Sequence, residues 1–202
     1  MNEVEADHVV PSLGPALYTE WRVADIGVIT DCLERALILE LAGTVAGLRV
    51  LDVGCGDGDL ALALWERIAQ VTGIDASPEM IDAARLRAKN QKAAIAFEVA
   101  AAEHLPLASD QFDLVVAVTI LCFVPNAAPV FQEIARVLRP GGRLAVMVPT
   151  AGRLARYWQL LPNVGAHAFD DDEIGDVLEG NGFASVRVKN LGTFQWVRGK
   201  KG

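Results

Sequence analysis

The chain has 202 residues, and just over half of them are hydrophobic, which suits a single domain with a large buried core. Its formal net charge of −8 at pH 7 argues against nucleic-acid binding, because such binding neutralises phosphates with lysine and arginine. No apolar run is long enough to span a membrane, and the polar start at residues 1–5 does not resemble a signal peptide. We therefore expect a cytoplasmic enzyme.

The three cysteines, Cys32, Cys55 and Cys122, lie far apart and lack the paired spacing of metal ligands. An odd, scattered set favours neither a disulfide framework nor a zinc site. We expect reduced cysteines and no bound metal.

Segments with strand and helix character alternate along most of the chain, which predicts a parallel sheet covered on both faces. We expect strands at residues 49–53, 71–75, 95–100, 112–118 and 143–148, and helices at residues 31–41, 59–69, 78–90 and 127–138. Ser77 can cap the helix whose first residue is Pro78. Asn126 can cap the last of these helices, which should end before Pro140.

The pattern changes after the fifth strand, where residues 150–169 are expected to form a lid insertion. A helix near residues 171–179 follows, and then two strands, 183–190 and 193–198, with a connection so short that they must pair antiparallel. We predict an α/β fold with a Rossmann-like, doubly wound, seven-stranded sheet, mostly parallel with an antiparallel C-terminal hairpin. Residues 1–202 would form one domain, with a helical cap at residues 1–45.

A glycine-rich turn follows the first strand of the sheet, with Gly54, Gly56 and Gly58 at alternate positions. Glycine at such positions lets a ligand approach the main chain, and the next helix offers unpaired N–H groups. Asp75 ends the second strand, where an acid can accept both hydroxyls of a ribose. The dinucleotide fingerprint would need glycine or alanine at Asp59, so the spacing disfavours the alternative of an NAD-dependent oxidoreductase.

Five motifs in order extend this pattern, at residues 50–58, 73–80, 102–107, 112–116 and 136–144. On these motifs the chain resembles the class I S-adenosylmethionine-dependent methyltransferases. The resemblance is to the methyltransferase type 11 branch, which is similar to enzymes of ubiquinone and menaquinone biosynthesis. It implies S-adenosylmethionine as cofactor and S-adenosylhomocysteine as product.

The resemblance also implies which residues bind the cofactor. They are Asp52, Gly54, Cys55, Gly56, Gly58, Asp75, Ala76, Met80, Ala102, Glu103, Val118 and Thr119. Among them, Asp75 would hold the ribose diol, Met80 would face the adenine, and Thr119 would lie near the methionyl tail. The chain departs from the family at Ala101, where relatives commonly carry an aspartate that meets the adenine, and at Cys122, where many have histidine.

The expected reaction is methyl transfer by in-line displacement to a small-molecule acceptor. Residues of the cap and the lid supply the candidates for acceptor binding, namely Tyr18, Trp21, Arg22, Arg153, Tyr157, Trp158 and His167. Tyr18 and His167 are also candidate general bases. An alternative is a non-catalytic regulatory or partner subunit that binds the cofactor, and Ala101 is the feature that favours it.

Overall fold

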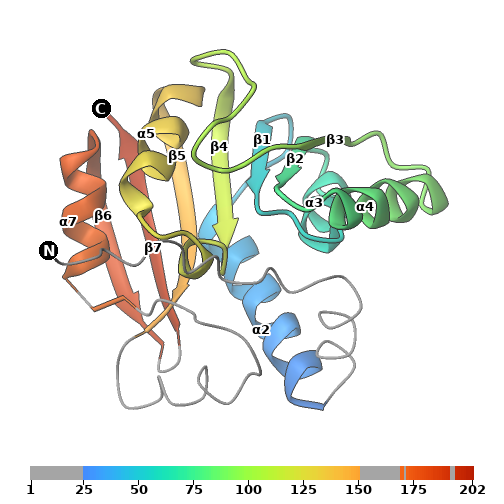
Figure 1. Ribbon diagram of the computed structural model, residues 1–202, viewed down its shortest axis with the longest axis horizontal. Helices are drawn as coiled ribbons and strands as arrows, with labels where there is room; N and C mark the ends of the chain where they lie inside the picture. The colour runs from blue at the N-terminus through green and yellow to red at the C-terminus, as the bar shows by residue number, and fades with distance from the viewer. Residues whose placement is uncertain (1–24, 151–168, 171, 192–193) are drawn as a thin grey trace, which may run out of the picture.

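A computed structural model of the chain describes residues 25–150, 169–170, 172–191 and 194–202. Within these residues a seven-stranded sheet has the order β3-β2-β1-β4-β5-β7-β6, with helices on both faces (Figure 1). The strands are β1 (Arg49–Val53), β2 (Gln70–Asp75), β3 (Ala96–Val99), β4 (Phe112–Val118), β5 (Leu138–Pro149), β6 (Phe183–Asn190) and β7 (Phe194–Lys201). The helices are α2 (Asp25–Ala42), α3 (Asp59–Trp65), α4 (Pro78–Asn90), the short 3-10 helix η1 (Leu121–Phe123), α5 (Ala127–Val137) and α7 (Glu173–Gly180).

Five neighbouring strands pair in parallel, in the order β3, β2, β1, β4 and β5, whereas β7 pairs antiparallel with both β5 and β6. This arrangement confirms the predicted fold class, including the antiparallel hairpin at the end of the chain.

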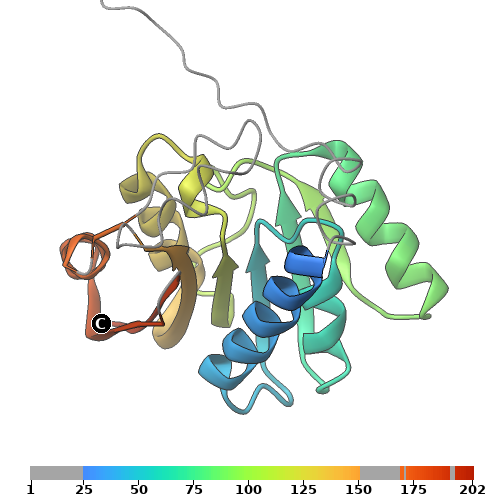
Figure 2. The ribbon, with the colours of Figure 1, turned by 90° about the horizontal axis from the view of Figure 1, so that it is seen from below.

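Side chains of the central strands alternate between two hydrophobic layers. Figure 2 shows from below the helices that cover the two faces of the sheet. On one face Leu51 and Val115 pack with α5 and α7. On the other face Val50 and Val116 pack with α2, α3 and α4. All four side chains are fully buried, so the strands read as continuous hydrophobic runs, as expected for the centre of a covered parallel sheet.

Both predicted helix caps are present. The Ser77 hydroxyl accepts a hydrogen bond from the Met80 N–H at 3.2 Å, and α4 begins at Pro78. The Asn126 side-chain oxygen accepts a bond from the Ala128 N–H at 3.0 Å, and α5 ends at Val137. These local signals therefore predict the starts of both helices correctly.

Four predicted boundaries are wrong by three residues or more. One is the end of the last strand, which is Lys201 rather than residue 198. The helix predicted at 59–69 ends at Trp65, because the chain turns through a left-handed conformation at Ile68, with φ 65°. The last parallel strand begins at Leu138 rather than residue 143. Its pairing with β4 shifts register between Phe112 and Leu114, and this irregularity lets the strand continue through Gly141. The helix predicted at 31–41 is longer and begins at residue 25.

The two ends of the predicted lid insertion lie side by side. Thr150 and Phe169 form an isolated parallel bridge, and the Phe169 N–H donates to the Pro149 carbonyl at 3.0 Å. Residues 151–168 and 1–24 lie outside the described residues, so the lid and the first half of the cap stay predictions.

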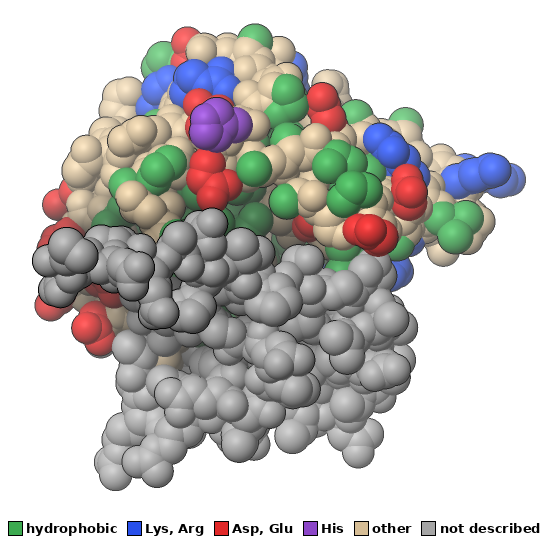
Figure 3. Space-filling view, in the orientation of Figure 1, with side chains coloured by type: hydrophobic (Ala, Val, Ile, Leu, Met, Phe, Trp, Pro, Cys, Tyr) green, Lys and Arg blue, Asp and Glu red, His purple; other side chains and the backbone are tan. Residues whose placement is uncertain are grey.

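Charges of both signs are interspersed on the described part of the face in Figure 3, without an extended patch of one sign. None of the described helices is long and apolar enough to cross a membrane.

Replacement of Phe131 tests the packing beneath α5. Its side chain is fully buried and meets the Phe183 ring edge to face, with centroids 6.4 Å apart. Phe131→Ala should lower the free energy of unfolding by about 3–5 kcal/mol in urea denaturation, because it leaves a cavity. The control Leu86→Ala removes a side chain that is 59% exposed and should change it by less than about 0.5 kcal/mol. Equal effects of the two substitutions would contradict the assignment of the core.

Candidate functional site

The predicted cofactor residues gather where the strand order reverses. From β1 the sheet continues in one direction through β2 and β3, and in the other through β4 and β5. Ligands of such sheets bind outside the carboxyl ends of the strands at this reversal. The structure places the Gly54–Gly58 loop after β1, Asp75 at the end of β2, and Thr119 directly after β4. These segments therefore meet at one edge of the sheet.

The three glycines of the loop after β1 (residues 54–58, the glycine loop) are all left-handed, with φ of 73°, 52° and 79°. A Cβ on Gly54 would lie 2.5 Å from Ile120 Cδ1, and a Cβ on Gly58 would lie 2.9 Å from Ala84 Cβ. Packing therefore requires glycine at both positions. A Cβ on Gly56 would have no neighbour within 4 Å, so the middle of the loop faces open space that a ligand can fill.

Asp75 ties the glycine loop to the next helix. Its Oδ2 accepts a hydrogen bond from the Gly56 N–H, and its Oδ1 accepts one from the Ser77 N–H, both at 2.9 Å. Each carboxylate oxygen has a second lone pair. Asp75 can therefore keep the loop in place and also accept ribose hydroxyls.

Asp52 is a buried carboxylate at the end of β1, 1% exposed. Burial, and to a smaller extent the nearby negative charge of Asp75, raises its pKa to about 7. Within the described part of the chain, its Oδ2 has no hydrogen-bond partner. A buried carboxylate oxygen without a donor is costly, so this position fits a cationic group of a ligand.

Thr119 carries backbone strain at the end of β4. Its φ of 57° is rare for a β-branched residue, and such strain is concentrated at functional sites. The Thr119 N–H donates to Met147 O at 2.9 Å, and its carbonyl accepts from the Cys122 thiol at 2.9 Å. The Thr119 hydroxyl donates to the Glu34 carboxylate of α2 at 3.4 Å. Glu34 is not among the residues predicted from the sequence, since only the fold brings α2 to this strand end.

Cys55 points away from the open side of the loop. Its side chain is buried in the layer beneath α3 and α4, and a Cβ on Gly73 would lie 2.9 Å from its sulfur. Burial raises the pKa of the Cys55 thiol far above its usual range. Its predicted cofactor contact therefore rests on its main chain. Burial likewise raises the pKa of Cys122 to about 12, which leaves both thiols protonated.

The residues predicted to surround the adenine follow β2 and β3, which are neighbours in the sheet. Met80 and Ala102 are buried, Glu103 is half-buried and Ala76 is exposed. Their adenine contacts stay predictions.

The residues predicted for acceptor binding or as general bases lie outside the described residues. They are Tyr18, Trp21, Arg22, Arg153, Tyr157, Trp158 and His167.

Comparison with known proteins agrees with this geometry. Residues 51–146 match the family model described as a methyltransferase domain, of type 11. The ubiquinone biosynthesis O-methyltransferase of Aeromonas salmonicida is 39% identical over 110 residues, which cover 54% of this chain and 46% of that protein. This segment is a class I methyltransferase domain. The chain spans about half the length of the curated relatives it matches.

Solved structures extend the likeness of this methyltransferase domain beyond the matched segment. An S-adenosylmethionine-dependent methyltransferase from Methanosarcina mazei is 26% identical with a TM-score of 0.67, covering 81% of this chain and 96% of that one. The [4+2]-cyclase SpnF is 21% identical with a TM-score of 0.76, covering 89% of this chain and 83% of that one. The second likeness concerns the fold alone, and it shows that proteins of this fold carry other reactions.

The pH dependence of stability tests the environment of Asp52. Because the pKa rises from 3.8 to about 7 on folding, the native state holds this proton more tightly, and stability must fall as pH rises between these values. From pH 5 to pH 8, the native protein should lose about 3 kcal/mol more unfolding free energy than Asp52→Asn, measured by urea denaturation. An identical pH dependence in both proteins would show that Asp52 ionises normally.

Proposed function

We propose that the protein transfers a methyl group from S-adenosylmethionine to a small-molecule acceptor. The observation that carries the proposal is the buried Oδ2 of Asp52, which has no partner among the described residues and lies beside the glycine loop and Asp75. In dinucleotide enzymes this loop takes an anionic pyrophosphate, which is a poor partner for a buried carboxylate oxygen. A cofactor with a sulfonium and an ammonium group is positively charged there, and its ribose offers hydroxyls to Asp75. Asp52 and the spacing of the glycines therefore argue against NAD, whereas an acid at the position of Asp75 is common to both classes of cofactor.

Each part of the proposed site has its own task. The open face at Gly56 lets the ligand lie against the main chain, and Asp75 accepts the ribose hydroxyls. The unpaired oxygen of Asp52 receives a positive charge, for which the ammonium of the methionyl tail is suited. Thr119 follows β4, on the opposite side of β1 from Asp75. Met80 offers an apolar side chain toward the adenine.

When bound, the cofactor supplies a methyl group on a sulfonium, and the sulfur is a good leaving group because it departs as the neutral thioether. The task of the chain is then to align the acceptor and to exclude water. A general base is needed only for an acceptor that arrives protonated, and Tyr18 and His167 are the proposed candidates. The aromatic and cationic residues of the cap and lid suit a flat or anionic acceptor.

A non-catalytic cofactor-binding protein is the second candidate, favoured by Ala101. In the structure the Ala101 carbonyl accepts a bond from the His104 N–H at 3.0 Å, so the turn after β3 closes through its main chain. The turn therefore forms without the aspartate that relatives carry there. Cofactor binding with no methyl transfer would support this second candidate.

The test is transfer of a labelled methyl group from S-adenosylmethionine to a panel of small phenols, quinones, amines and carboxylates. We expect turnover of at least one class. Asp75→Asn should raise the KM for S-adenosylmethionine by about tenfold or more, because charge-assisted bonds to the ribose are lost. The matched control Asp82→Asn, on the exposed side of α4 with its side chain 78% exposed, should leave the KM unchanged. An Asp75→Asn enzyme with a normal KM would remove Asp75 from the site.

A further inference from the structure

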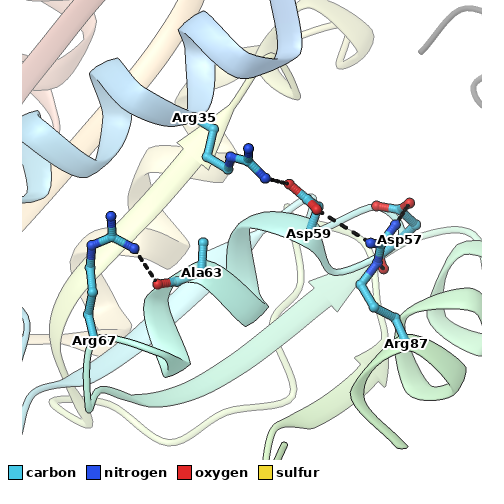
Figure 4. Close-up of polar contacts among 6 residues, drawn as sticks. All are labelled: Arg35, Asp57, Asp59, Ala63, Arg67 and Arg87. Carbon is cyan, nitrogen blue, oxygen red and sulfur yellow. Dashed lines mark hydrogen bonds and ion pairs between the residues drawn. The ribbon is translucent and has the colours of Figure 1, made fainter. Parts of the chain in front are cut away.

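A chain of ion pairs connects α2, the glycine loop and α4 (Figure 4). Arg87 of α4 pairs with Asp57 in the loop and, at 3.4 Å, with Asp59 at the first position of α3. Arg35 of α2 pairs with the other oxygen of Asp59 at 2.8 Å. Asp59 thus lies between two guanidinium groups that come from different helices.

These contacts hold the glycine loop from two sides. On one side Asp75 accepts the Gly56 N–H. On the other side Arg87 donates through Nε to the Asp57 carbonyl at 3.0 Å, so it fixes the main chain at the next residue. The open glycine at position 56 is therefore held by Asp75 through its own N–H and by Arg87 through the carbonyl of the next residue.

Consecutive residues of α2 reach both loops that border the site. Arg35 contacts Asp59, which follows the glycine loop after β1. Glu34 accepts from the Thr119 hydroxyl, which follows β4. One turn of α2 thus bridges the two strand ends between which the cofactor is proposed to bind.

We propose that Arg35 is a positioning residue, which acts through Asp59 to hold the glycine loop in the conformation that binds the cofactor. Docking of α2 and affinity for the cofactor are then coupled. That the cofactor is S-adenosylmethionine rests on the proposed function, whereas the role of Arg35 in ordering the glycine loop does not. Arg35 and Asp59 are 39% and 20% exposed, so solvent weakens their pair and the effect is modest.

The first measurement is amide hydrogen exchange without any ligand. Arg35→Gln should accelerate exchange of the amides of residues 54–59 by about two- to fivefold. A partly exposed ion pair stabilises the closed loop by about 1 kcal/mol at most, which corresponds to a change of that size in the opening equilibrium. Arg87→Gln should accelerate it at least as much. The matched control is Arg67→Gln, since the Arg67 side chain donates to the Ala63 carbonyl at 2.8 Å, at the far end of α3 from the glycine loop (Figure 4). That control should leave the exchange of the loop unchanged.

The second measurement is calorimetric titration of the same variants with S-adenosylhomocysteine. Arg35→Gln should raise the Kd by about three- to fivefold, and Arg35→Lys should recover part of the loss. Combining Arg35→Gln with Asp59→Asn should weaken binding no more than Asp59→Asn alone, because Asp59→Asn already removes the pair with Arg35, together with the pair with Arg87. Arg67→Gln should bind as the native protein does.

The outcomes separate the two proposals. Faster loop exchange in Arg35→Gln, in a protein whose native form does not bind S-adenosylhomocysteine, would keep the positioning role and overturn the proposed function. Normal exchange and a normal Kd in Arg35→Gln would overturn the positioning role alone. Equal changes in Arg35→Gln and Arg67→Gln would also overturn it, because the effect would then be general.

Discussion

Parallel strands bring their carboxyl ends to the same edge of a sheet, and here β1 pairs in parallel with β2 on one side and β4 on the other. The register sets Val53 opposite both Ile74 and Ala117. The glycine loop, Asp75 and Thr119 therefore emerge together, although Thr119 lies 65 positions after Gly54 in the sequence. All other features of the candidate site depend on this pairing.

Charge then decides what the site can bind. A glycine loop that opens a helix generally suits an anion, since its N–H groups point outward. In this chain Asp75 already accepts the Gly56 N–H, and burial, with the nearby charge of Asp75, raises the pKa of Asp52. We therefore propose that the loop holds a positive group beside a ribose. The buried Asp52 and the spacing of the glycines distinguish this site from that of the dinucleotide folds, which share an acid at the position of Asp75.

The sequence predicted most of the fold because its signals were local or periodic. Ser77 before Pro78 marked the start of α4, and the short connection after Asn190 required an antiparallel hairpin. The irregularity at Gly141 was missed, because it depends on pairing with β4 rather than on its own residues. The ends of the glycine loop were found from sequence, but the different reasons for Gly54 and Gly56 appear only when the neighbours are in place.

Contacts between elements distant in sequence could not be predicted. Arg35, Asp59 and Arg87 look like ordinary surface charges in the sequence, and only the packing of three helices brings them together. The left-handed backbone of Thr119 likewise has no local signal.

The most direct test of the central claim is calorimetric titration of the native protein with S-adenosylmethionine, S-adenosylhomocysteine and NAD. We expect saturable binding of the first two at one site and no binding of NAD, because Asp52 suits the ammonium group that both S-adenosyl compounds carry and the spacing of the glycines departs from the dinucleotide fingerprint. Binding of NAD, or failure of both S-adenosyl compounds to bind, would contradict it.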